Sequence, residues 1–215
     1  MTYLEIVNDI LVRLRENEVT SVNDTTYSKL ISKYVKDAQR TVEDAYSWNS
    51  LAVTLSAVTS PDLFNYVLVG SGNRFRMLDA INDTSNWFMQ YKSSEEMNSL
   101  FLNASPAKGS PTHFNFNGFS PEGDTQVDLY PIPNGAYDLR FNIIQPQDPL
   151  KFDSDKLLVP EEPVIFLATA KALAERGEDG GIASAEMYAL YKESLADHVA
   201  IEMSRHPDEQ VWYGV

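Results

Sequence analysis

The apolar positions at the start of the chain follow the spacing of a helix. They form a broad arc from Tyr3 to Leu14 and recur three or four residues apart. Thr2 and Glu5 stand three residues apart just ahead of this arc, which is typical of a capping box. Arg13 places positive charge in the last turn, where the helix dipole favours it. The pattern predicts a helix over this segment.

A second amphipathic segment follows the turn residues Asn23 and Asp24. Apolar side chains keep helical spacing from Tyr27 to Trp48, so we expect the helix to extend to that tryptophan. Charged side chains occupy the opposite face: Lys29, Lys33, Lys36, Asp37, Arg40 and Glu43.

The pattern changes from helical to alternating after Trp48-Asn49. Runs typical of half-buried strands cover residues 51–57, 63–69, 75–78, 87–91, 112–116, 126–130 and 137–144. Residues rich in Pro, Gly, Asn and Asp separate these runs, and 93–101 has the spacing of a short helix. Because no long crossover helix intervenes, the strands are expected to be mostly antiparallel.

Helical spacing returns near Pro160, a residue suited to the first turn of a helix. Residues 164–174 are apolar on almost every side, which predicts a central helix that ends near Gly177. A last helix is expected from about Ser184 to Arg205, with four residues along one face: Tyr188, Tyr191, Leu195 and Val199.

These elements predict an α+β fold. The helices at the two ends of the chain, 1–48 and 156–206, are expected to form one discontinuous bundle. Residues 49–155 form a β-rich, mainly antiparallel insert between them, and 207–215 form a C-terminal tail.

Composition narrows the function classes. The formal net charge is −14, which disfavours tight binding to a phosphate backbone. Such a charge favours solubility, and it also suits a surface past which DNA slides without sticking. The chain has no cysteine, and its start lacks the pattern of a signal peptide. Its longest apolar run is too short to span a bilayer, so we expect a soluble protein with no membrane partner.

The segment Gly70-Ser71-Gly72 raises the question of a phosphate-binding loop. A dinucleotide fingerprint needs a third glycine where Phe75 stands, followed by a helix, and a Walker-type loop needs Gly-Lys-Ser/Thr. The strand-like residues on both sides favour a glycine-rich turn in a β-hairpin instead.

Other candidate chemistry is weak. No two of the three histidines have the spacing of a ligand pair, and Asp153 and Asp155 only partly match a calcium loop. Glu161 and Glu162 are adjacent on a helix and point apart, and no Gly-x-Ser-x-Gly motif occurs. The sequence therefore predicts no catalytic, cofactor or metal site and no enzyme.

The tail is a candidate partner-binding segment. Val211, Trp212 and Tyr213 carry large apolar surface near the end of the chain. Trp and Tyr are favoured anchors at protein interfaces, although they could also fold back onto their own domain. We expect them to bind a partner.

Four segments resemble bacteriophage head-to-tail adaptors, including the tail tubular protein A type of short-tailed phages. They are YLEIVNDILVRLRENEV (3–19), YSKLISKYVKDAQRTVEDAYSWNSL (27–51), VPEEPVIFLATAKALAERGEDGG (159–181) and AEMYALYKESLADHVAIE (185–202). Together they cover both helical arms, whereas the β insert carries no matching motif.

The resemblance implies a structural virion protein, made in the bacterial cytoplasm, that forms a ring, typically of twelve copies. Such a ring lies between the portal protein and the tail nozzle or tail tube and extends the DNA channel without binding DNA specifically. It needs no cofactor, and the aromatic tail would suit insertion into the portal.

Three other interpretations remain open. A carbohydrate- or receptor-binding β module of a phage tail could use the aromatic residues of the insert: Phe114, Phe116, Phe119 and Tyr130. Such residues more often form the core of a sheet. An enzyme of unrecognised type is the second. A third interpretation is a relative in fold alone, with an unrelated scaffold role.

Overall fold

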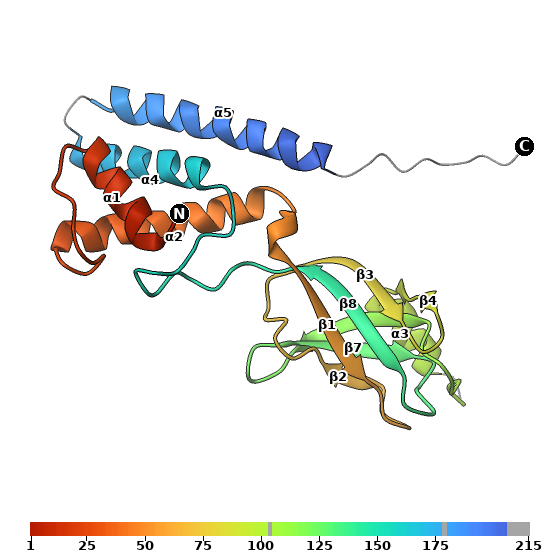
Figure 1. The fold of residues 1–215 in the computed structure, drawn as a ribbon. Coiled ribbons are helices and arrows are strands. Elements are labelled where there is room, and N and C mark those ends of the chain that lie inside the picture. The colour runs from red at the N-terminus through yellow and green to blue at the C-terminus, as the bar shows by residue number, and fades with distance from the viewer. Residues whose placement is uncertain (103–104, 178–179, 206–215) are drawn as a thin grey trace, which may run out of the picture. The chain divides into compact units, whose positions relative to one another are not determined.

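The computed structural model describes residues 1–102, 105–177 and 180–205 (Figure 1). Within them the fold is α+β, as predicted, with five α-helices, one short 3-10 helix and eight strands. The helices are α1 (Tyr3–Arg13), α2 (Thr26–Ala45), η1 (Asn49–Leu51), α3 (Ser94–Phe101), α4 (Glu161–Arg176) and α5 (Ile182–Ser204). The strands are β1 (Ala52–Val58), β2 (Asn65–Val67), β3 (Arg76–Asn82), β4 (Trp87–Phe88), β5 (Gln90–Tyr91), β6 (His113–Phe119), β7 (Thr125–Tyr130) and β8 (Asp138–Ile144).

Contacts divide the chain into two compact units. The helical unit comprises 1–51 and the described residues from 147 to 205, and the sheet unit comprises the described residues from 52 to 146. The domain boundaries expected from the sequence, a bundle of 1–48 with 156–206 and an insert of 49–155, stay a prediction.

The first helix begins as its sequence predicts. The Thr2 hydroxyl accepts a hydrogen bond from the Glu5 amide at 3.3 Å, and the Glu5 carboxylate accepts one from the Thr2 amide at 2.8 Å. This reciprocal pair confirms the capping box. It also holds the pKa of Glu5 below its usual value, because the bonded form is the carboxylate.

The second helix ends earlier than expected. Helix α2 stops at Ala45, and Tyr46 is already extended, so the prediction that it reaches Trp48 is wrong. The last carbonyls of a helix have no partner within it. The indole nitrogen of Trp48 donates to one of them, the Val42 carbonyl, at 2.7 Å. Trp48 therefore closes the helix from outside instead of extending it.

Helix α4 occupies the middle of the helical unit. It packs against α1, α2 and α5, which explains why its apolar residues face every side. Gly177 ends it in the left-handed conformation, at φ 64°, and its amide donates to the Leu173 carbonyl. On α5 the buried residues are Tyr191, Ser194 and Glu202, whereas Tyr188 is exposed, so the apolar face expected there is only partly correct.

The sheet unit contains two four-stranded sheets, in the orders β1-β8-β3-β4 and β2-β7-β6-β5. Every pairing is antiparallel except that of β5 with β6, which confirms a mainly antiparallel region. Buried side chains from both sheets form one core, which includes Ala80, Phe114, Val127, Leu129, Leu139 and Phe141.

The strand pairing differs from the sequence prediction at two places. Strand β2 pairs with β7 while β3 pairs with β8, so the predicted hairpin around Gly70-Ser71-Gly72 is wrong and this turn joins two sheets. The run 87–91 is split between β4 in one sheet and β5 in the other. Met89 lies between them, buried in the shared core, which makes the change of sheet favourable.

Candidate functional site

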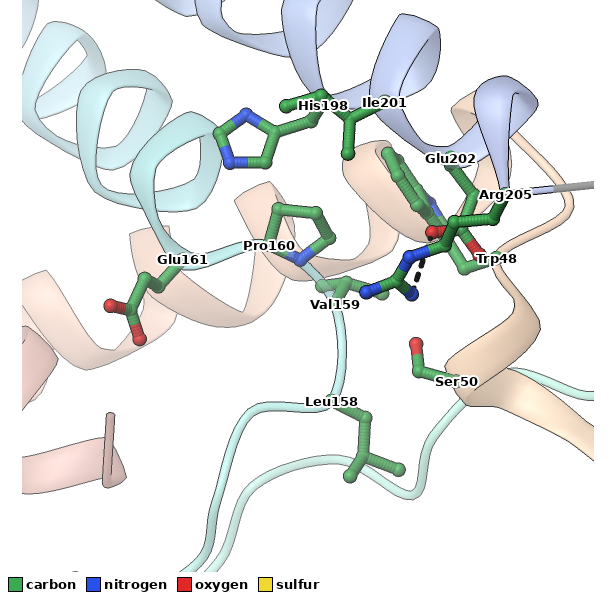
Figure 2. Close-up of a pocket in the computed structure, with 10 residues that line it drawn as sticks. All are labelled: Trp48, Ser50, Leu158, Val159, Pro160, Glu161, His198, Ile201, Glu202 and Arg205. Atoms are coloured by element: carbon green, nitrogen blue, oxygen red, sulfur yellow. Dashed lines mark hydrogen bonds and ion pairs between the residues drawn. The ribbon is translucent and has the colours of Figure 1, made fainter.

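A groove of about 460 Å³ lies in the helical unit, beside the end of α5 (Figure 2). The loop before α4 supplies one side, the residues after α2 supply the floor, and one face of α5 supplies the other side. Its lining is Trp48, Ser50, Leu158, Val159, Pro160, Glu161, His198, Ile201, Glu202 and Arg205. Figure 2 shows the Glu161 carboxylate on the far side of Pro160 from Arg205, so the two charges act on different parts of the groove.

Glu202 is a buried carboxylate with two partners. It accepts hydrogen bonds from the Asn49 amide at 2.9 Å and from the Arg205 guanidinium at 3.1 Å. A buried charge is tolerated when it is paired and hydrogen-bonded. Because Asn49 follows Trp48, this carboxylate ties the residues after α2 to the last turn of α5 and fixes the floor of the groove.

Replacement of Glu202 by alanine is expected to lower the free energy of unfolding by roughly 1–3 kcal/mol, because the Asn49 amide loses its acceptor in a partly buried place. Glu202→Gln retains an acceptor oxygen and should lose less. Chemical denaturation followed by circular dichroism measures both. Glu175→Ala, an exposed helical glutamate on α4, is the matched control. Equal losses for the alanine and glutamine variants would instead assign the effect to the ion pair with Arg205.

His198 is next to a serine and a glutamate but does not form a nucleophilic triad with them. Its Nδ1 lies 2.8 Å from the Ser194 carbonyl, to which it donates. The Ser194 hydroxyl lies 3.4 Å from that same nitrogen and 3.4 Å from the Glu162 carboxylate. A general base needs a free lone pair facing the hydroxyl. Since Nδ1 is already used as a donor, this arrangement does not activate Ser194.

Two amides of the glycine-rich turn have partners within the chain, since Ser71 donates to the Leu68 carbonyl and Gly72 to Asp124. The Gly72 amide donates to the Asp124 carboxylate at 3.0 Å, so an acidic side chain of the chain itself occupies that place. Ser71 is buried, and its hydroxyl accepts from the Thr125 amide at 2.9 Å. Strand β3 follows, not a helix. The predicted turn is therefore present, although it is not a hairpin.

The aromatic residues proposed for a carbohydrate module do not form one surface. Phe114 is 4% exposed and belongs to the core between the sheets. Phe116 packs against that core, whereas Phe119 is 58% exposed. Tyr130 stacks edge-on against Phe101 of α3. Phe114 and Phe116 thus serve mainly to hold the sheets together.

The residues predicted to bind a partner, Val211, Trp212 and Tyr213, lie outside the described residues. The described part of α5 leads to Arg205, beside the groove. Glu202 and Arg205 could not be identified from the sequence, because charged side chains near the end of a long helix are usually solvated. The one available signal was the Trp48-Asn49 junction, which marks where α2 stops.

The described residues hold no group of three or more His, Asp or Glu side chains that could bind a metal ion. Over the same residues, no helix is long and apolar enough to cross a membrane.

Comparison with known proteins identifies the family. No curated protein matches the chain. The sequence model of the SU10 adaptor protein family matches residues 1–211, which is almost the whole chain, and Trp212 and Tyr213 lie just beyond the match. The resemblance to phage adaptors is thereby confirmed, while the tail tubular protein A type stays a prediction. The chain belongs to the SU10 adaptor protein family and is a structural adaptor protein of a phage virion.

Proposed function

We propose that this adaptor forms a ring between the portal and the tail of a phage and extends the channel through which DNA leaves the head. The family match over residues 1–211 carries the proposal. Adaptor proteins of a phage act through contacts with portal and tail components, and a closed ring is the symmetric arrangement that leaves a channel open.

The charge of the chain supports a passage for DNA. A net charge of −14 repels the phosphate backbone, so DNA meets little friction from specific or non-specific binding. The family match also supports a structural role, because it assigns the chain to adaptor proteins.

Contact with the portal is assigned to the segment Val211, Trp212 and Tyr213. Aromatic side chains contribute large apolar area at little cost in conformational entropy, which makes them effective anchors in a pocket of a partner. The groove beside Arg205 and the portal are two alternative places for this segment, and the variants described in the Discussion distinguish them.

The proposal is tested by co-expression with the portal protein encoded in the same phage genome, followed by purification and negative-stain electron microscopy. The expected result is a second ring stacked on one face of the portal, with a mass that gives the number of copies, twelve by resemblance. A bare portal ring, with this chain left unbound and monomeric, would contradict the proposal.

A further inference from the structure

Helices α2 and α5 form opposite sides of the helical unit. Helix α4 packs against α2 on one side and against α5 on the other. Figure 1 shows α2 and α5 running in the same direction, with α4 running the opposite way between them. Each outer helix therefore has a side turned away from α4, and α2 also packs against α1 along one edge, where Lys36 lies over the Tyr3 ring.

The outer face of α2 carries a basic stripe, which we define as Lys29, Lys33, Lys36 and Arg40. Lys29, Lys33 and Arg40 are exposed, and Lys36 is half-buried with its ammonium over the Tyr3 ring. In the part of the chain that the structure describes, none of the four is recorded in an ion pair. The stripe is opposite in sign to the chain as a whole, whose net charge is −14.

The outer face of α5 carries an acidic stripe, defined as Glu186, Glu193 and Asp197. All three are exposed, and over the described residues none is recorded in an ion pair. Leu190 lies between the first two and is also exposed. Ala189, Ala196 and Ala200 follow the acidic stripe, and their small side chains leave room for another helix to approach closely.

The two stripes have the same spacing. From Lys29 to Lys36 to Arg40 the steps are seven and four residues, and from Glu186 to Glu193 to Asp197 they are again seven and four. At 1.5 Å per residue both helices place their charges about 10 Å and then about 6 Å apart. Two parallel helices in this register bring every acidic side chain opposite a basic one.

We propose that the α5 acidic stripe of one copy packs against the α2 basic stripe of the next copy. In this contact Lys29 faces Glu186, Lys36 faces Glu193 and Arg40 faces Asp197. The inference rests on the proposed ring and names the faces that join its subunits.

An apolar hollow on α2 gives this contact a place for Leu190. A pocket of about 530 Å³ is lined by Thr26, Tyr27, Lys29, Leu30 and Lys33. In the same register Leu190 lies opposite Lys33, beside this hollow. A leucine flanked by two acids thus meets a hollow rimmed by two lysines, whose aliphatic stems can cover it. Apolar contact supplies affinity there, and the charges supply register and orientation.

The direction of the helices indicates that the partner in this contact is a second copy of the chain. Two different faces on opposite sides of one subunit make a head-to-tail contact, and such contacts repeat into a ring when the rotation closes. Because α2 and α5 run parallel within one subunit, a small rotation between neighbours keeps them nearly parallel. That is the arrangement in which the stripes match.

Two charge-reversed variants test the contact. The first, Lys29→Glu with Arg40→Glu, makes the α2 face acidic, and the second, Glu186→Lys with Asp197→Lys, makes the α5 face basic. Each is expected to weaken self-association at least about tenfold in analytical ultracentrifugation, because like charges then face each other. The four positions are exposed and should leave the thermal melting of the monomer nearly unchanged.

Mixing the two variants in equal amounts is expected to restore assembly. Each reversed α2 then meets a reversed α5, and each native α2 meets a native α5, so the oligomers contain both variants in equal numbers. Lys151→Glu with Lys156→Glu reverses two exposed lysines outside both stripes and should assemble like the parent chain.

Assembly of each variant alone at the parent affinity would overturn the assigned faces. Failure of the mixture to assemble, while the parent chain does, would also overturn them. Rings stacked on the portal from either variant alone would overturn the faces but leave the proposed function intact. A parent chain that stays monomeric both alone and with the portal would overturn both.

Discussion

Replacement of Trp48 by alanine is expected to lower the free energy of unfolding of the helical unit by about 3–5 kcal/mol, the usual range for removal of a buried tryptophan. Trp48 is 2% exposed, so nearly all of its side chain leaves a cavity. The Val42 carbonyl loses the indole donor that lies 2.7 Å away, and the edge-on contact with Tyr46 disappears. The variant therefore loses both core packing and the hydrogen bond that stabilises the end of α2.

Denaturation followed by circular dichroism at 222 nm measures this loss, since most of the helical signal comes from the helical unit. Trp48→Phe retains an aromatic ring without the donor and should lose an intermediate amount. Phe152→Ala is the matched control, because that ring is 70% exposed in the same unit, and it should change stability by less than about 0.5 kcal/mol. An alanine variant as stable as this control would show that Trp48 does not close α2.

Deletion of residues 211–215 is expected to abolish stacking of the adaptor on the portal while leaving its circular dichroism and melting unchanged. The proposed contact depends on Trp212 and Tyr213, and loss of a few aromatic anchors commonly removes most of the affinity of an interface. Co-purification with a tagged portal, followed by negative-stain imaging, measures the loss. The deletion should not affect the contact between α2 and α5 stripes, so self-association should persist.

Point substitutions in the same segment test whether the aromatic side chains themselves make the portal contact. Trp212→Ala with Tyr213→Ala should reproduce most of the deletion. Asp208→Asn with Glu209→Gln changes the same segment without removing aromatic area and should retain portal binding. Lower melting temperatures for the deletion and the aromatic variant would place these side chains on their own domain instead. Normal stacking of the deletion variant would contradict the portal contact.

Local features of the helical unit could be predicted from the sequence. A capping box needs only residues three apart, so Thr2 and Glu5 identify the start of α1. Apolar residues on almost every side indicate that α4 is central, because exposing any of its faces to water would be unfavourable. In contrast, the end of α2 depends on where the Trp48 indole goes, and helical spacing alone continues past Ala45.

The sheet unit shows where local patterns stop being sufficient. Alternation predicted most of the strands but not their partners, because each strand in isolation can pair with many others. The glycine turn at 70–72 looks like a hairpin turn locally, yet it joins β2 and β3 of different sheets. Likewise, the run 87–91 alternates like one strand, and only burial of Met89 in the core divides it.

By itself, the sequence determined the fold class, the helices with their capping residues, the mainly antiparallel strands and the resemblance to phage adaptors. The helices, strands and fold class follow from apolar spacings of two, three or four residues. The resemblance follows from comparing individual segments with those of phage adaptors. Only the tertiary structure decided that the buried Glu202 carboxylate accepts a hydrogen bond from the Asn49 amide. It also decided that the Trp48 indole donates to the Val42 carbonyl at the end of α2. It also decided that α4 lies between α2 and α5. These features join residues far apart in the chain, and their energies depend on desolvation and packing that no local pattern records.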